Sequence, residues 1–359
     1  NGKLLEVFNR AVVRSGLAAR PAGGATPGPQ VTAQKQSPAR AEQAVTRALR
    51  LAVQAQQDPA SAPKVLQQLE GQVEVELVPG ENVFSVVGFN GAGNLNARPV
   101  TRTVQASGTA QAPRIFVLAV GIDVFKNANA APTLANGVKD STDVANAFRE
   151  RLGSTYRDSP VIVRMVQNQQ ATRAGLDAAL ADLQREVRSN DILVWYVASH
   201  GTLDNNAAYG IVLQDWDGKE REDSLFSTND ILEATRRIKA FNQLVILDTC
   251  HAGGASSLVR GLYDARLAVL ARNMGLHIFA SASATEEALD GYEGNGLFTH
   301  TLLKGLRTGV ADKNADRVVT VKELGEYARR ETMGLSQKIR LNQEPLLMNF
   351  GKDVNVYAI

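Results

Sequence analysis

The chain has 359 residues, of which 44% are hydrophobic and 21% charged, so most of it is predicted to fold around apolar cores. The 39 basic and 37 acidic side chains nearly cancel, which argues against nucleic acid as a partner. No apolar run reaches the ~18 residues of a transmembrane helix, so no membrane partner is expected. The sole cysteine, Cys250, rules out an intrachain disulfide and a cysteine-rich zinc site.

The N-terminal third predicts two regions, 1–71 and 72–112. Apolar side chains recur within 1–20, 41–56 and 61–70 in patterns typical of helices, and the Pro/Gly-rich stretch 21–39 is typical of a flexible linker. From Gln72 the period changes to two, with turns at Pro79-Gly80 and Asn90-Gly91, which predicts three short strands. These strands resemble the last strands of an immunoglobulin-like domain.

Residues 113–359 alternate between buried strands and helices. Strands are predicted at 114–122, 161–166, 192–198, 244–247 and 277–282, and helices at 141–152, 171–187, 229–238, 258–272 and 298–306. A hairpin is expected within 209–214. This order predicts an α/β fold with an open, mostly parallel sheet and helices on both faces.

Two of these strands run directly into chemically active residues. The strand 192–198 is followed by Ser199-His200-Gly201, and the strand 244–247 leads into Asp248-Thr249-Cys250. Ligands and chemistry collect at the carboxyl ends of strands in open α/β sheets, so His200 and Cys250 are expected to lie side by side. A neighbouring imidazole would favour the thiolate of Cys250.

The two strand-end motifs resemble the caspase-like cysteine peptidases of the metacaspase and bacterial caspase-homologue type. The resemblance extends to Asn136-Gly-Val-Lys-Asp140, to Ala280-Ser-Ala-Ser283 and to Gly296-Leu-Phe-Thr299. It implies a six-stranded, mostly parallel sheet over 113–359. It also implies a cysteine-type endopeptidase without a required cofactor.

The resemblance implies a role for each matching residue. His200 would be the general base and acid, Cys250 the nucleophile, and the amides of Gly201 and Cys250 the oxyanion donors. The neighbouring His251 is expected to support the loop, because adjacent residues at a strand end point to opposite sides. His277 and His300 are expected to be structural.

Cleavage after Arg or Lys is expected from two carboxylates. Asp248 and Asp140 match the acidic residues that line the pocket for the residue before the scissile bond in metacaspases. Two partly desolvated carboxylates attract a cation and reject an anion. The alternatives are that Asp248 orders the cysteine loop and that Asp140 is the N-cap of a helix starting at Ser141.

The stretch from Asp312 to Glu323 has oxygen-bearing side chains at loop positions 1, 3, 5, 9 and 12, as in an EF-hand. Position 6 is Arg317, where that loop requires glycine for its turn. We therefore expect a turn, a short strand at 318–321 and a helix that carries Glu323, and no metal site. Calcium activation is known among metacaspases, where it acts through acidic residues that no motif of this sequence identifies. It stays open for this chain.

The resulting prediction is a thiol protease that cuts proteins after basic residues in bacterial regulated proteolysis or defence, with an N-terminal region that regulates it or recruits a partner. Two alternatives stay open: a catalytically weak scaffold of the same fold, and acyl transfer to an acceptor other than water. The expected location is the cytoplasm. Because the chain begins with Asn1 rather than Met, a signal peptide ahead of it also stays open.

Overall fold

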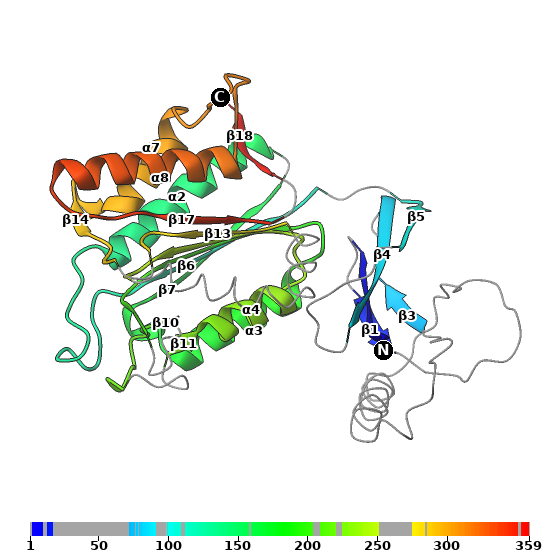
Figure 1. Ribbon diagram of the computed structural model, residues 1–359, viewed down its shortest axis with the longest axis horizontal. Coiled ribbons are helices and arrows are strands. Elements are labelled where there is room, and N and C mark those ends of the chain that lie inside the picture. Colours follow the sequence, from blue (N-terminus) through cyan, green and yellow to red (C-terminus); the bar gives the residue numbers. More distant parts are fainter. Residues whose placement is uncertain are drawn as a thin grey trace, which may run out of the picture. The chain divides into compact units, whose positions relative to one another are not determined.

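The computed structural model describes two compact units, one within residues 1–110 and one within 111–359 (Figure 1). The described residues are 2–9, 13–16, 72–75, 77, 79–90, 98, 100–108, 112–157, 159–203, 209–219, 225–250, 275–283, 286–350 and 353–358. Among them no helix is long and apolar enough to cross a bilayer.

The N-terminal unit is built from strands. An antiparallel sheet has the order β1 (Gly2–Asn9), β4 (Gly80–Asn90), β5 (Val100–Ala106). A second pair joins β2 (Val13–Gly16) to β3 (Gln72–Val75). The three strands expected within 72–112 are therefore present. The helices expected at 41–56 and 61–70, and the linker at 21–39, lie outside the described residues.

The helix expected within residues 1–20 is wrong for both described segments of that range, which are β1 and β2. In β1, Val7 lies opposite Val86 of β4, and Glu6 opposite Val87. Pairing with a strand about 80 residues away satisfies the backbone of β1 and overrides a weak local preference for helix.

The larger unit contains a six-stranded sheet in the order β17-β13-β12-β8-β6-β7. Five strands are parallel, and β17 pairs antiparallel with β13 at one edge. This confirms the predicted mostly parallel sheet and adds β17, which the strand pattern did not single out. The bounds are β6 Ile115–Gly121, β7 Val161–Gln167, β8 Ile192–Ala198, β12 Asn242–Asp248, β13 Leu276–Ala280 and β17 Leu346–Asn349.

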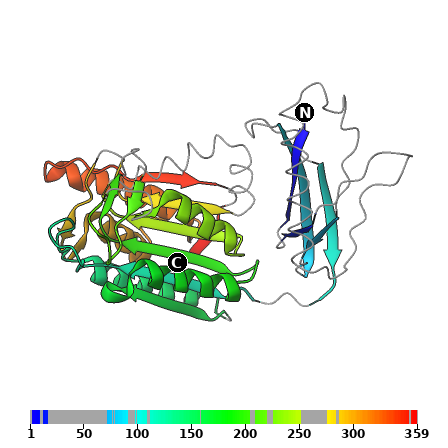
Figure 2. The same ribbon diagram turned by 90° about the horizontal axis from the view of Figure 1, so that it is seen from below.

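Helices cover both faces of the sheet (Figures 1 and 2). Along β6, Phe116, Leu118 and Val120 pack toward α3 (Arg173–Glu186) and α4 (Thr228–Arg237). The alternate residues of β6, Ile115, Val117 and Ala119, pack toward α2 (Gly137–Thr155), α7 (Leu297–Thr308) and α8 (Val321–Lys338). Each strand of this kind is apolar on both faces, which is why its sequence is a continuous apolar run.

Shorter elements decorate the carboxyl ends of the strands. The hairpin expected within 209–214 is instead formed by β9 (Gly201–Leu203) and β10 (Tyr209–Ile211), and β10 also pairs with β11 (Phe226–Ser227). The remaining pairs join β14 (Asp290–Tyr292) to β15 (Asn295–Gly296) and β16 (Val318–Thr320) to β18 (Asn355–Ala358). A short 3₁₀ helix, η1, spans Asn168–Gln170, and the helix expected at 258–272 lies outside the described residues.

The stretch 312–323 forms the expected turn, short strand and helix start. Thr320 caps α8, and the Glu323 carboxylate accepts hydrogen bonds from the backbone nitrogen and hydroxyl of Thr320. Arg317 has a φ of 67°, so the chain makes the left-handed turn without the glycine that the sequence argument required. The Glu323 carboxylate therefore serves as part of a capping box.

Candidate active site

Two neighbouring parallel strands deliver the histidine and the cysteine to one edge of the sheet. Ala198 at the end of β8 lies opposite Asp248 at the end of β12. The chain leaves β8 through His200 and leaves β12 through Cys250. A Cβ atom on Gly201 would lie 2.2 Å from the carbonyl oxygen of Cys250, so the two segments touch.

His200 is oriented by a backbone carbonyl and an aromatic ring. Its Nε2 lies 2.6 Å from the carbonyl oxygen of Pro132. The ring of Phe125 lies 5.0 Å from the imidazole, centroid to centroid. Because a carbonyl oxygen only accepts hydrogen bonds, Nε2 carries the hydrogen in this contact, and Nδ1 is left as the nitrogen that can take up a proton.

Cys250 is the only cysteine, and its thiol faces the segment before β14. Its Sγ donates to the carbonyl oxygen of Ala288 at 3.9 Å. Burial raises the pKa of the thiol, and the negative charge of Glu287 adds to the shift. Both effects favour the thiol over the thiolate.

Gly201 must be glycine because the chain is crowded there. Besides the Cys250 oxygen, a Cβ on Gly201 would lie 2.8 Å from the Thr249 hydroxyl and 2.9 Å from the Tyr209 ring. The Tyr209 and Thr249 hydroxyls are hydrogen-bonded to each other at 2.6 Å. The glycine thus permits the close approach of the segments that carry His200 and Cys250.

Asp140 and Asp248 converge on Gly296. Asp140 accepts hydrogen bonds from the Gly296 nitrogen at 2.9 Å and from Asn295 Nδ2 at 2.6 Å. Asp248 accepts from the Thr299 hydroxyl at 2.5 Å. A Cβ on Gly296 would lie 3.0 Å from an Asp140 oxygen and 3.2 Å from an Asp248 oxygen. The two carboxylates therefore share one small region beside the cysteine strand.

The alternative that Asp140 caps a helix starting at Ser141 is wrong. Helix α2 begins four residues earlier, at Gly137, and Asn136 occupies the N-cap position. The Val138 nitrogen donates to Asp123 Oδ1 at 2.9 Å, so a carboxylate from another segment performs the capping. Asp140 lies inside the helix, and its 3% exposed side chain is directed at the residues before α7.

A third carboxylate, Asp290, completes what we call the acidic cluster: Asp140, Asp248 and Asp290. Asp290 on β14 accepts from the Ala135 nitrogen at 2.6 Å and from Asn136 Nδ2 at 2.8 Å. No sequence motif pointed to Asp290, because it lies among Glu286, Glu287 and Glu293 in a stretch with the composition of a solvated loop. The only signal was its place shortly after a strand end.

Burial and neighbouring negative charges raise the pKa values of two members of the acidic cluster, Asp140 and Asp248. Burial, followed by the charge of Asp248, raises the pKa of Asp140 to about 7. Burial also raises the pKa of Asp248, and the charge of Asp290 contributes. In the described part of the chain, the side chains and amides bonded to Asp140 and Asp248 are all uncharged. The cluster thus holds more negative charge than its partners neutralise.

The remaining predicted residues fall in two groups. His277 is buried on β13, bonded through Nδ1 to Asn349, and His300 lies on α7 with its Nε2 3.8 Å from Glu293, so both occupy the expected elements. His251 lies outside the described residues.

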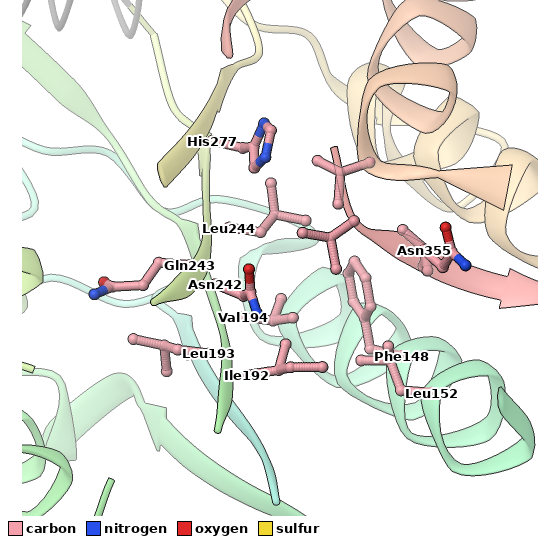
Figure 3. Close-up of a pocket in the computed structure, with 13 residues that line it drawn as sticks. Phe148, Leu152, Ile192, Leu193, Val194, Asn242, Gln243, Leu244, His277 and Asn355 are labelled. Atoms are coloured by element: carbon pink, nitrogen blue, oxygen red, sulfur yellow. The ribbon is translucent and has the colours of Figure 1, made fainter. Parts of the chain in front are cut away.

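A small apolar cavity of about 20 Å³ lies at the amino ends of the strands, the opposite edge of the sheet from His200 and Cys250. It is lined by residues that include Phe148, Leu244 and His277 (Figure 3).

The larger unit matches a known protein family. The family model described as Caspase domain (Peptidase_C14) matches residues 114–348, from the start of β6 into β17. A similar solved structure is the crystal structure of protein GSU0716 from Geobacter sulfurreducens. It is 16% identical, with a TM-score of 0.47, over 67% of this chain and 94% of that one. No curated protein matches the sequence.

Proposed function

Since the chain belongs to the caspase domain family of cysteine peptidases, we propose that it is an endopeptidase that cuts peptide bonds after Arg or Lys. The observation that carries the specificity is the acidic cluster beside Cys250. A guanidinium or ammonium group brought to Asp140 and Asp248 replaces their mutual repulsion with two attractive contacts. An acidic or apolar side chain would leave the partly buried charges unmatched.

The proposed reaction proceeds through a thioester. His200 Nδ1 takes the proton of the Cys250 thiol as sulfur attacks the peptide carbonyl, and the oxyanion is held by the amides of Gly201 and Cys250. The C–N bond breaks as the imidazolium gives its proton to the leaving amine. Water then attacks the thioester with His200 as base, and the carboxylate product and the free thiol are released. Because the surroundings of Cys250 favour the thiol over the thiolate, transfer of its proton to His200 accompanies the attack of sulfur.

The position of Pro132 supports this division of roles. Its carbonyl holds the hydrogen on Nε2, and it accepts a stronger hydrogen bond once the ring becomes an imidazolium. The same contact fixes the plane of the ring. Within the residues that the structure describes, His200 is thus oriented by a backbone carbonyl and not by a carboxylate side chain.

A peptide panel tests the specificity. Peptides identical except for the residue before the cut would carry Arg, Lys, citrulline, Leu or Asp. Arg and Lys peptides should be cut, and the citrulline peptide, a neutral isostere of Arg, at least about a hundredfold more slowly, because it leaves the carboxylates unpaired. Asp248→Asn should raise KM for the Arg peptide. Asp182→Asn, on the exposed surface of α3, is the matched loss of one charge and should not.

Each result of the panel decides between functions. Equal rates on Arg and citrulline peptides would refute recognition by charge. Cleavage of no peptide would favour a scaffold of the same fold. Release of amide rather than acid in the presence of an added amine would favour acyl transfer.

A further inference from the structure

We propose that Gln343 is a positioning residue of this site: its amide clamps the segment 281–290, described at 281–283 and 286–290, and so places Ala288 against the nucleophile and Asp290 in the acidic cluster. The proposal rests on the proposed peptidase function. Gln343 lies between α8 and β17, far along the chain from the residues that it holds. No motif of the sequence analysis includes it.

The clamp uses both atoms of the Gln343 amide. Its Oε1 accepts from the Leu289 nitrogen at 3.0 Å, and its Nε2 donates to the Ser281 carbonyl at 2.9 Å. The side chain is 2% exposed. One planar group therefore holds both Ser281, just after β13, and Leu289, just before β14, and neither residue can shift without breaking its hydrogen bond to Gln343.

The residues on either side of Gln343 reinforce the clamp. Glu286, in the middle of the segment, accepts from the Glu344 nitrogen at 2.8 Å, and its other carboxylate oxygen is bonded to Asn342 Nδ2. Arg329 of α8 forms an ion pair with Glu344. Three consecutive residues, 342–344, thus contact the segment at its start, middle and end.

The clamped segment contacts the reacting residues directly. The Ser281 hydroxyl donates to the Thr249 carbonyl at 3.2 Å and accepts from the Thr249 nitrogen at 3.1 Å, which fixes the residue before the nucleophile. Ala288 offers its carbonyl to the Cys250 thiol. Next to Leu289, Asp290 adds its charge to those of Asp140 and Asp248.

The consequence of losing the clamp is therefore specific. Packing of the two cores does not involve the Gln343 amide, so the sheet and helices should persist. The segment would lose two anchors, and Ala288 and Asp290 would no longer be held in register with Cys250. A displacement of about 1 Å between binding groups and a nucleophile costs up to about a hundredfold in rate. Recognition of a basic side chain should therefore suffer more than the reactivity of the thiol towards a small reagent, which does not use the acidic cluster.

The test compares two buried glutamines. Gln343→Met keeps the volume and removes both hydrogen bonds. Gln243→Met makes the same change at the amino end of β12, where Nε2 donates to three carbonyl groups far along the sheet from the site. Because Cys250 is the only cysteine, its modification is read unambiguously by intact mass. The reagents are a peptidyl-arginyl chloromethyl ketone and iodoacetamide, used at least 15 °C below each variant's thermal midpoint.

The ratio of the two inactivation rates is the readout. The rate with the arginyl reagent divided by the rate with iodoacetamide should fall at least about tenfold in Gln343→Met. In Gln243→Met this ratio should stay within about twofold of wild type. An unchanged ratio in Gln343→Met, with wild type preferring the arginyl reagent, would overturn the clamp alone. A wild-type protein without preference for the arginyl reagent would overturn the proposed function, and the clamp with it. If Gln343→Met fails to fold, the variant Asn342→Ala replaces it in the test, because Asn342 is exposed and also bonds to Glu286. It should lower the same ratio, and an unchanged ratio would overturn the clamp.

Discussion

At the scale of single residues, the site is defined by how little charge neutralises its carboxylates. Asp140 is 3% exposed and receives hydrogen bonds only from uncharged groups within the described chain. The nearby carboxylates then make a second ionisation unfavourable, so the pKa of Asp140 rises to about 7 through burial and the charge of Asp248. Near neutral pH the cluster therefore holds a proton that a bound cation must expel.

Proton release should therefore accompany cation binding. Benzamidine added to the Cys250→Ala protein at pH 7 should release about half a proton, and near pH 9 almost none. Below about pH 6 its affinity should fall about tenfold per pH unit, since the ligand binds the ionised form and the pKa of Asp140 is raised to about 7. Calorimetry in buffers of different ionisation enthalpy measures the proton count. No release at any pH would mean that Asp140 does not meet the cation, and Asp140→Asn is the control.

The catalytic pair makes a second prediction at this scale. Cys250→Ala should abolish hydrolysis and leave the thermal midpoint within a few degrees. His200→Ala should lower kcat/KM about 10²–10⁴-fold, the usual contribution of a positioned base. His251→Ala should cost far less, as measured by steady-state kinetics on the Arg peptide. The reverse order of the two histidine variants would move the base to His251.

At the scale of elements, glycines show where helices touch the sheet. In α8, a Cβ on Gly325 would lie 2.6 Å from the Phe279 ring of β13, whereas one on Gly334 meets nothing within 4 Å. One helix therefore has a face that packs against the strand beside the cysteine strand and a face that does not. The absence of a side chain at Gly325 lets α8 pack close against the sheet at Phe279.

Alanine substitutions in α8 should have opposite effects on stability. Gly334→Ala should stabilise the fold by about 0.5–1 kcal/mol, because alanine loses less backbone entropy in a helix. Gly325→Ala should destabilise it by about 1–3 kcal/mol, because the methyl group overpacks against a buried ring. Urea unfolding followed by circular dichroism measures both. A stabilising Gly325→Ala would show that α8 can move away from β13 at little cost.

At the scale of the whole molecule, the candidate catalytic residues and the small apolar cavity lie at opposite edges of the sheet. His200, Cys250 and Asp248 follow the carboxyl ends of two adjacent strands, and the small apolar cavity lies at the amino ends. The loops that follow the carboxyl ends of the strands can therefore vary in sequence without disturbing the two hydrophobic cores. The N-terminal unit has strands and pairings of its own, and its role in regulation or recruitment stays a prediction.

The order of self-cleavage tests the whole chain. An Arg/Lys-specific peptidase should first cut its own chain where the sequence is typical of a linker, after Lys35 or Arg40, and not after Arg20, which precedes a proline. Arg260 and Arg266 fall in the stretch expected to be helical, which must unwind before it can be cut. Intact-mass analysis over time, with Cys250→Ala as control, reads the order. A first cut after Arg260 or Arg266 would show that this stretch is a processing linker.

The sequence alone determined the five parallel strands of the central sheet and the residues that follow β8 and β12. These follow from local signals, namely continuous apolar runs that must be buried and motifs that end them. It did not determine the fate of residues 2–9, whose strand depends on a partner about 80 residues away. Nor did it determine the start of α2, because the Asp123 carboxylate that caps α2 comes from another segment.

Asp290 and Gln343 were decided only by tertiary structure. Asp290 acquires its importance from two carboxylates that precede it by 150 and 42 positions, and Gln343 from amides and carbonyls that precede it by 54 and 62 positions. Coulomb interactions and hydrogen bonds depend on distances in space, and no periodicity or local motif encodes which distant residues a buried side chain will meet.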